Sequence, residues 1–154
     1  MRLSVLTNLM SERSLWGHFG WKGSIVMACD IRIIPVKEFL RTDISGVIDL
    51  RASRELLGDL MTVCLHKKMD RILIDSREAS SNASTTDVWT LANDLGRLGV
   101  SREYRVAILN LPKDDFDRGA FLELCASNRG YQLRAFRDFE EAFKWLTSDE
   151  TAEV

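Results

Sequence analysis

The sequence predicts an α/β domain in which a small, mostly parallel sheet of four to five strands is flanked by four helices. The first observation behind this prediction is that short β-branched or apolar runs alternate with longer segments whose apolar residues recur every three or four positions. The second is the length of 154 residues, which suits one domain with its own core. Strands that alternate with helices pair in parallel through right-handed crossovers, and this decides the fold class.

The strands are predicted from short runs of apolar, mostly β-branched residues. The first run covers residues 31–36, and we place it at an edge of the sheet because Pro35 has no N–H to donate to a neighbouring strand. Residues 39–43 are a candidate second strand, antiparallel to the first. The apolar run 71–75 is typical of a strand buried on both faces. Two further strands are expected at residues 104–109 and 131–136.

The helices are predicted from apolar stripes and from the residues that begin and end them. Ser84-Thr85-Thr86-Asp87 precedes one stripe and has the spacing of a capping box, with Asp in place of the usual Glu or Gln. Gly99 and Gly130 are expected to end the second and third helices, and Asp138 is expected to cap the last. The four stripes run through residues 50–67, 88–98, 121–128 and 139–146.

Two polar segments are predicted to be loops. Residues 76–86 are rich in Ser and Thr, and residues 111–117 contain Pro112 and three acids. These acids, Asp114, Asp115 and Asp117, lack the regular spacing and the glycine turn of a calcium loop, so we interpret them as a solvated acidic segment.

The patterned sequence divides the chain into three parts. We expect the domain to cover residues 30–147 and to be followed by an acidic tail, residues 148–154. Residues 1–29 are interpreted as an N-terminal extension, either disordered or the product of a mis-assigned start, in which case translation begins at Met27. No run approaches the roughly 18–20 apolar residues of a membrane helix.

Composition excludes several classes of function. Lys plus Arg is 21 and Asp plus Glu is 23, so the net charge is 21 − 23 = −2, which disfavours a nucleic-acid binder. Cys29, Cys64 and Cys125 are widely spaced and form no zinc motif, which indicates reduced thiols, no metal site and a cytoplasmic protein. The sequence contains no nucleophile elbow, phosphate-binding glycine loop or paired-histidine motif, so we expect no enzyme and no cofactor.

Five segments taken together resemble the SpoIIAA-like proteins of the STAS-like class, which are bacterial. The resemblance implies a SpoIIAA-like architecture of successive βα units and a regulatory or protein-interaction role in the cytoplasm. It also implies a partner of the kinase or anti-sigma type. The segments are residues 71–77, 84–87, 105–109, 121–130 and 136–146.

The best-understood members of this class carry a phosphorylatable serine at the beginning of the helix that follows a strand ending in Asp. In this chain Asp75 is followed by Ser76, Arg77 and Glu78 without a glycine, and the segment before the helix is longer. By position, the only residues that match the phosphorylation site are therefore Ser84, Thr85 and Thr86. Their alternative role is to cap the helix, since a hydroxyl there accepts free backbone N–H groups.

Three further residues are candidates for a ligand or partner edge. Asp75 and Arg77 follow a predicted parallel strand, where ligands commonly bind in open α/β sheets, but they are equally well explained as an ion pair that ties the chain. Trp89 lies at the margin of an apolar stripe, and an exposed Trp there would suit a protein partner.

The sequence thus predicts a non-enzymatic, protein-binding regulatory domain. The alternative is a module that binds a small molecule or a lipid in apolar space between the last helices and the sheet. A homodimer is a further alternative, because small α/β domains often self-associate.

Overall fold

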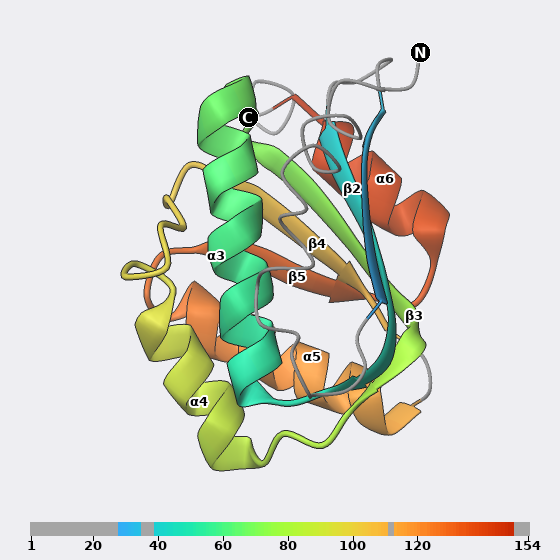
Figure 1. Cartoon of the computed structure of the whole chain (residues 1–154), viewed down its shortest axis with the longest axis vertical. Helices are drawn as coiled ribbons and strands as arrows, with labels where there is room; N and C mark the ends of the chain where they lie inside the picture. The colour runs from blue at the N-terminus through green and yellow to red at the C-terminus, as the bar shows by residue number, and fades with distance from the viewer. Residues whose placement is uncertain (1–27, 35–38, 111–112, 150–154) are drawn as a thin grey trace.

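The computed structural model describes residues 28–34, 39–110 and 113–149, and it contains one five-stranded sheet in the order β1-β2-β3-β4-β5. The strands are β1 (Ala28–Ile34), β2 (Phe39–Ile48), β3 (Arg71–Ser81), β4 (Arg105–Leu109) and β5 (Gln132–Phe136). The helices are α3 (Leu50–Lys67), α4 (Thr85–Asp94), α5 (Lys113–Ser127) and α6 (Phe139–Thr147). Figure 1 shows this arrangement, and it confirms the predicted α/β class.

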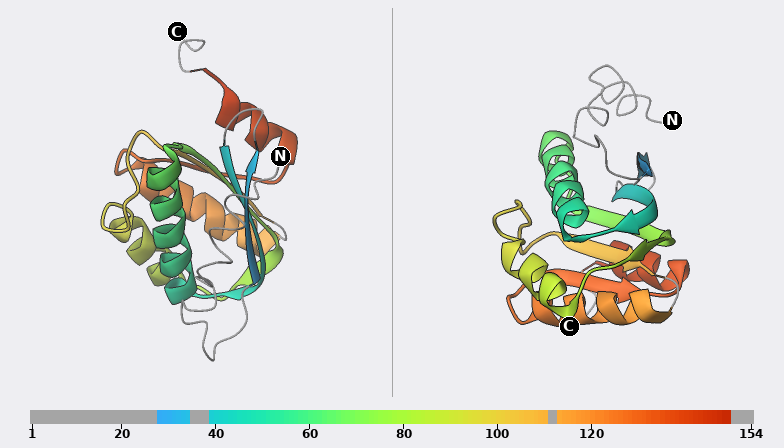
Figure 2. Two further views of the ribbon diagram at one scale, coloured as in Figure 1. Left: turned by 45° about the horizontal axis from the view of Figure 1, so that its top comes forward. Right: turned by 60° about the horizontal axis from the view of Figure 1, so that its bottom comes forward.

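The pairing of the strands explains how the helices are distributed. β1 is antiparallel to β2, as expected, and lies at the edge of the sheet, while β2 to β5 are all parallel. Because each parallel strand is followed by its immediate neighbour, crossovers of one hand place α3, α4 and α5 on the same face of the sheet. α6 follows the last strand and packs on the opposite face (Figures 1 and 2).

Each face of the sheet has its own apolar core. Alternate residues of the strands point to α3, α4 and α5, and these form the larger core with the buried sides of those helices. The other alternate residues form a smaller core with Ala142 and Leu146 of α6. Its aromatic pairs include Phe39 with Phe143, whose ring centroids lie 5.9 Å apart in an edge-to-face arrangement.

Local signals set most helix ends where the sequence predicts them. The Asp49 carboxylate accepts a hydrogen bond from the Ala52 N–H, and Asp138 caps α6 in the same way. Gly99 and Gly130 both have positive φ, at 97° and 82°, and Gly130 closes the turn after α5 as predicted. The prediction that Gly99 ends the second helix is wrong, because α4 ends at Asp94 and turns occupy residues 95–99. The helix predicted over residues 50–67 has those bounds in the structure.

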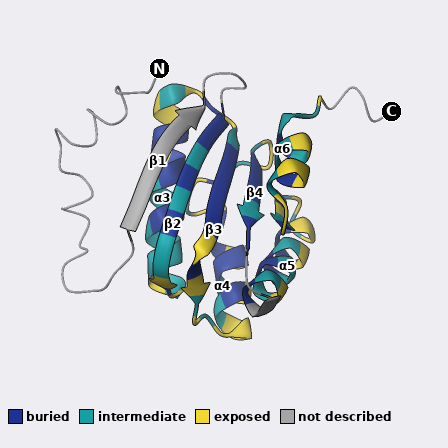
Figure 3. Ribbon diagram, turned by 90° about the vertical axis from the view of Figure 1, so that its right-hand side faces the viewer, coloured by how far each residue is buried: buried dark blue, intermediate teal, exposed yellow. Residues whose placement is uncertain are grey.

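The prediction that residues 76–86 form a loop is wrong for its first half, because β3 continues to Ser81. Past Asp75, β3 loses β4 as a neighbour but still pairs with β2, where Ser45 lies opposite Glu78. Because two residues of β2 match three of β3 there, a bulge shifts the alternation of β3. Figure 3 shows the exposed far end of this strand.

The prediction that residues 111–117 form a solvated loop is also wrong from Lys113 onward, and its first two residues lie outside the described part of the chain. α5 begins at Lys113, so the three acids belong to a helix, and Asp115 is buried. Acidic residues suit the first turn of a helix because they complement its dipole, which is the signal that the interpretation as a loop overlooked. Leu65 and Leu124 lie within the predicted apolar stripes of residues 50–67 and 121–128, but both side chains are exposed.

The expectations for residues 1–27 and 150–154 lie outside the described residues. Within the described part, β1 begins at Ala28, two residues before the predicted domain boundary. No helix among the described residues is long and apolar enough to cross a membrane.

Candidate functional site

The hydroxyl cluster at the beginning of α4 forms the predicted capping box. Ser84 Oγ accepts a hydrogen bond from the Asp87 N–H at 3.1 Å, and the Asp87 carboxylate accepts one from the Ser84 N–H at 2.9 Å. Ser84, Thr85 and Thr86 are all exposed. The structural explanation for Ser84 is therefore confirmed, and its exposure also leaves the cluster accessible to a modifying enzyme.

Trp89 lies one turn further along α4 and is 51% exposed. The Arg129 guanidinium lies 5.7 Å from the centre of its ring and also donates two hydrogen bonds to Asn93 Oδ1, at 2.9 and 2.7 Å. Arg129 follows α5, so it connects α4 to the end of the neighbouring helix. The surface of α4 thus presents the three hydroxyls and a half-exposed indole, which we call the α4 surface.

Asp75 and Arg77 form the ion pair that the sequence offered as one of two explanations. Arg77 donates from Nε and from a terminal nitrogen to the Asp75 carboxylate at 2.8 and 2.6 Å, and Arg41 of β2 donates to it at 2.8 Å. Burial alone would raise the pKa of Asp75, but the hydrogen bonds from Arg77 and the charges of both arginines hold this pKa below its usual value.

This ion-pair cluster lies on the α6 face of the sheet. Arg41 also pairs with Asp43 at 2.7 Å and lies 5.6 Å from the centre of the Phe139 ring, at the beginning of α6. The Asp75 carboxylate is already shared by two guanidinium groups, so the role of the cluster is to link β2 to β3.

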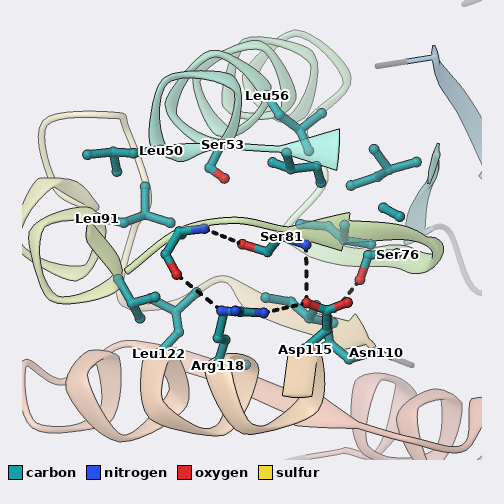
Figure 4. Close-up of a pocket in the computed structure, with 18 of the residues that line it drawn as sticks. Leu50, Ser53, Leu56, Ser76, Ser81, Leu91, Asn110, Asp115, Arg118 and Leu122 are labelled. Atoms are coloured by element: carbon teal, nitrogen blue, oxygen red, sulfur yellow. Dashed lines mark hydrogen bonds and ion pairs between the residues drawn. The ribbon is translucent and has the colours of Figure 1, made fainter. Parts of the chain in front are cut away.

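A cavity of about 130 Å³ lies on the other face, among β2, β3, β4, α3, α4 and α5 (Figure 4). Its wall is mostly aliphatic, with Leu56, Leu91 and Leu122 supplied by one helix each. The bulge in β3 contributes to this wall, because it turns both Ser76 and Ala79 toward the helices. The sequence did not predict which residues line this cavity.

The polar end of the cavity lies where β4 stops. Ser76 Oγ donates to the carbonyl of Leu109, the last residue of β4, at 2.6 Å, and accepts from Asn110 Nδ2 at 3.0 Å. Both side chains are buried. The remaining amide atom, Asn110 Oδ1, is buried and has no hydrogen-bond partner within the described residues.

An ion pair borders the cavity. Asp115, near the beginning of α5, accepts from the Ser81 N–H at 3.1 Å and from Arg118 at 2.8 Å. Arg118 Nε in turn donates to the carbonyl of Ala83 at 3.1 Å (Figure 4). These bonds connect α5 to the segment that leads into α4, so the cavity border and the hydroxyl cluster share a hydrogen-bonded frame.

Sequence reasoning missed Ser76, Asn110, Asp115 and Arg118. A usable signal for two of them was present, since Ser76 and Asn110 follow the apolar cores of two predicted strands. In neighbouring parallel strands such positions meet at the same edge of the sheet. Asp115 and Arg118 are spaced three residues apart, which places them on one side of a helix, but only once α5 is known to begin at Lys113.

The buried thiols are part of the packing. Cys64 and Cys125 are free and buried, and burial raises the pKa of Cys64 to about 12, with Asp70 contributing further. Such a thiol stays protonated and unreactive. Among the described residues no group of three or more His, Cys, Asp or Glu side chains has the arrangement to hold a metal ion.

Comparison with solved structures bears on the fold. A DUF3478-family protein from Shewanella loihica PV-4, described as having a SpoIIAA-like fold, superposes with a TM-score of 0.53 at 21% identity, covering 80% of this chain and 98% of that one. This chain has a SpoIIAA-like fold. It is also similar to the anti-sigma factor antagonist SpoIIAA in its unphosphorylated form, with a TM-score of 0.47, 15% identity and coverage of 79% and 100%.

The phosphorylated form of SpoIIAA from Bacillus gives a TM-score of 0.46 at 16% identity, with 77% of this chain and 98% of that chain covered. No protein-family model matches the sequence, and no curated protein matches it. The superposition on the Shewanella protein confirms the fold that the sequence resemblance predicts.

Proposed function

We propose that this protein is a non-enzymatic cytoplasmic regulatory domain that binds a protein partner through the α4 surface. Phosphorylation at Ser84, Thr85 or Thr86 would switch this binding. The observation that carries the proposal is the coincidence of three exposed hydroxyls and a half-exposed Trp89 on one helix. Exposed Trp residues are over-represented among the side chains that dominate binding energy in protein interfaces.

Phosphorylation would act strongly at this place. A phosphate adds a charge of about −1.5 to −2. At the beginning of α4 it would be stabilised by the helix dipole, and it would lie about one turn from Trp89. A partner that covers the indole would then meet a new dianion at the border of its contact, so its affinity would change. A kinase or a regulator of the anti-sigma type is the partner class that the sequence resemblance implies.

The experiment combines mass spectrometry with affinity purification of the full chain from its native cells. Trp89→Ala should weaken capture of the partner about tenfold or more, because it removes the largest exposed apolar contact on α4. Leu124→Ala is the matched control, since Leu124 is 57% exposed on the neighbouring helix α5 and should have no effect.

The switch is tested by variants that keep the helix intact. Ser84→Asn preserves a good cap but cannot be phosphorylated, and Thr85→Val and Thr86→Val keep the side-chain shape. The combined variant should fold normally. Because it cannot be phosphorylated, its partner binding should stay in one state, either bound or free. Partner binding that is unchanged in both Trp89→Ala and the combined variant, with no phosphate on any of the three hydroxyls, would refute the proposal.

A second candidate function is the binding of a small apolar ligand, and the cavity lined by Leu56, Leu91 and Leu122 favours it. Filling an apolar space of this kind is favourable, because the atoms that line it lack dispersion contacts on one side. Extraction of the purified protein followed by mass spectrometry should detect a stoichiometric apolar molecule. Alternatively, added apolar probes should raise the melting temperature.

A further inference from the structure

A polar cleft lies at the amino ends of β3, β4 and β5 and shares no residue with the apolar cavity. Its volume is about 400 Å³, and none of its lining residues is apolar. Three arginines and two acids line it, so its net charge is 3 − 2 = +1, which favours an anion. The lining residues are Asp70, Arg71, Arg102, Glu103, Arg105 and Gln132.

Two of the arginines are neighbours across the sheet. Arg71 of β3 and Arg105 of β4 are register partners, and Gln132 of β5 is the next residue in the same row. Neighbouring strands lie about 4.8 Å apart, and the side chains of register partners leave the sheet on the same side. Like charges placed in this way repel each other and destabilise the sheet. An anion bound beside the two arginines would offset this repulsion.

Arg105 forms the fixed base of the cleft. It is only 8% exposed, and its Nη1 donates to the carbonyls of Trp145 and Ser148 at 3.0 and 2.6 Å. Arg105 therefore holds the end of α6 against the sheet. Its positive charge adds to the potential of the cleft, although its hydrogen bonds serve the fold.

Arg102 is held in place from several sides. Its Nε donates to the Arg129 carbonyl at 3.0 Å, and its guanidinium lies 4.9 Å from the centre of the Tyr131 ring. Gln132 Nε2 donates to the Arg102 carbonyl at 3.0 Å. Gly130 leaves room for the side chain, because a Cβ there would lie 3.2 Å from Arg102 Nε. A guanidinium positioned in this way loses little freedom when an anion binds, which favours affinity.

The acids of the cleft do not neutralise Arg71 and Arg102 at contact distance. Arg71 Nε lies 3.9 Å from the Asp70 carboxylate, which is too far for a hydrogen bond, and this carboxylate is 67% exposed. Arg102 has no carboxylate partner within the described part of the chain. By contrast, Arg41 and Arg77 each donate to a carboxylate at 2.8 Å or less.

We infer that this cleft binds the phosphate group of a small molecule, with Arg71 and Arg102 as the donors. One guanidinium fork is enough for the two oxygens of a planar carboxylate, whereas a tetrahedral phosphate offers oxygens to two forks that approach from different segments. The cleft also has room for the rest of a small ligand, because small-molecule sites commonly measure about 300–1,000 Å³. The inference is independent of the functions proposed for the α4 surface and for the cavity.

The test is an NMR titration of the full chain with inorganic phosphate, glycerol phosphate and acetate, at an ionic strength kept constant with sodium chloride. Both phosphates should give saturable shifts of the backbone amide signals of Arg71, Glu103 and Gln132, with dissociation constants of about 1 mM or lower. Acetate should bind about tenfold more weakly. Tighter binding of glycerol phosphate would identify a phosphorylated molecule as the ligand, and equal binding would identify free phosphate.

Charge variants test which residues hold the phosphate. Arg71→Gln and Arg102→Gln should each weaken phosphate binding about tenfold, because each removes a charge-assisted pair. Glu103→Gln should strengthen binding, because it removes an opposing charge from the cleft. Arg51→Gln is the matched control, since the Arg51 side chain is 76% exposed on α3 and lies outside the cleft lining.

Three results would overturn the inference. Shifts that do not saturate, or equal weakening by Arg71→Gln and Arg51→Gln, would mean that phosphate is attracted only by diffuse charge. Acetate binding as tight as phosphate binding would exclude phosphate as the group that is recognised. Weaker phosphate binding in Glu103→Gln would mean that the excess positive charge does not govern the cleft. Arg102 and Glu103 are exposed, so their variants serve as the test if Arg71→Gln does not fold.

Discussion

The two faces of the sheet treat buried polar groups in opposite ways. On the α6 face the Asp75 carboxylate is shared by Arg77 and Arg41, and aromatic rings close the core around Leu146. On the face of α3, α4 and α5 a cavity remains, and Asn110 Oδ1 and Thr42 Oγ1 are buried without partners. On the α6 face the buried carboxylate is paired and the core is filled, whereas the other face has an unfilled cavity and unpaired polar atoms.

The difference shows which of the two cores can gain by binding something. The buried polar groups of the α6 face are already paired, whereas filling a cavity on the other face recovers dispersion contacts. The same reasoning explains why Asp75 and Arg77, although predicted as a ligand edge, are engaged with each other. The predictions below test this contrast, beginning with the largest effect.

The first prediction compares one leucine from each face. Leu146→Ala should lower the free energy of unfolding by about 3–5 kcal/mol, because Leu146 is fully buried and its deletion creates a new void. Leu91→Ala should cost only about 2–3 kcal/mol, because Leu91 already borders the cavity and has fewer contacts to lose. Urea denaturation of both variants measures the difference. Equal costs would mean that the α3–α5 face is as densely packed as the other.

The contrast between the faces was only partly predictable from the sequence. Period-2 and period-3.6 patterns located the strands and helices, because burial of one side repeats over several residues of an element. The bulge in β3 is a single-residue event, and the strand continues through Ser76 to Ser81 on the strength of pairing with β2. Such pairing is a long-range contact, so a serine-rich segment cannot reveal it by composition.

In the candidate site, too, contacts between residues close in the sequence were predictable and contacts between distant residues were not. Ser84 and Asp87 form a capping box that spans four consecutive residues, and it was predicted from their spacing alone. The pairing of Ser76 with Asn110 joins residues 34 positions apart, and the Asp115–Ser81 bond does the same. Both depend on where β4 ends and where α5 begins, which local patterns leave uncertain by a few residues.

The second prediction concerns two carboxylates whose pKa values shift in opposite directions. Arg77 and Arg41 hold the pKa of Asp75 below its usual value despite its burial, so its stabilising effect is present above about pH 4 and is lost as the pH falls through its lowered pKa. Asp75→Asn should therefore cost about 1–2 kcal/mol at pH 7, and less at pH 3. Asp43→Asn, at a more exposed partner of Arg41, should cost less.

Asp59 on α3 should behave in the opposite way. Burial, with a contribution from Glu55, raises the pKa of Asp59 to about 6, and its Oδ2 is buried without a partner in the described structure. The folded protein then binds more protons than the unfolded chain between about pH 4 and 6, so this contribution is lost as the pH rises through that window. Asp59→Asn should flatten the stability profile there and stabilise the protein at pH 7. The measurement is the free energy of unfolding from denaturation curves between about pH 3 and pH 8. If the wild-type protein, Asp75→Asn and Asp59→Asn have the same pH profile, the opposite roles of these two carboxylates are refuted.

The third and smallest prediction uses two glycines as matched probes of local space. Both lie inside helices, so replacing either by Ala gains about 0.5–1 kcal/mol of helix propensity. At Gly58 of α3 a Cβ would meet no atom within 4 Å, and Gly58→Ala should show this gain in full.

At Gly119 of α5 the added methyl group would lie 2.4 Å from Asn110 Oδ1 and 3.2 Å from the Ala135 Cβ. The amide must move, and its bond to Ser76 is lost or strained, so the gain should turn into a net loss of about 1 kcal/mol. The two melting temperatures should therefore move in opposite directions. If Gly119→Ala stabilises the protein as Gly58→Ala does, then Asn110 is free to turn away. The unpaired oxygen would then not be a fixed feature of the cavity wall, and the α3–α5 face would lose the property that sets it apart from the face of α6.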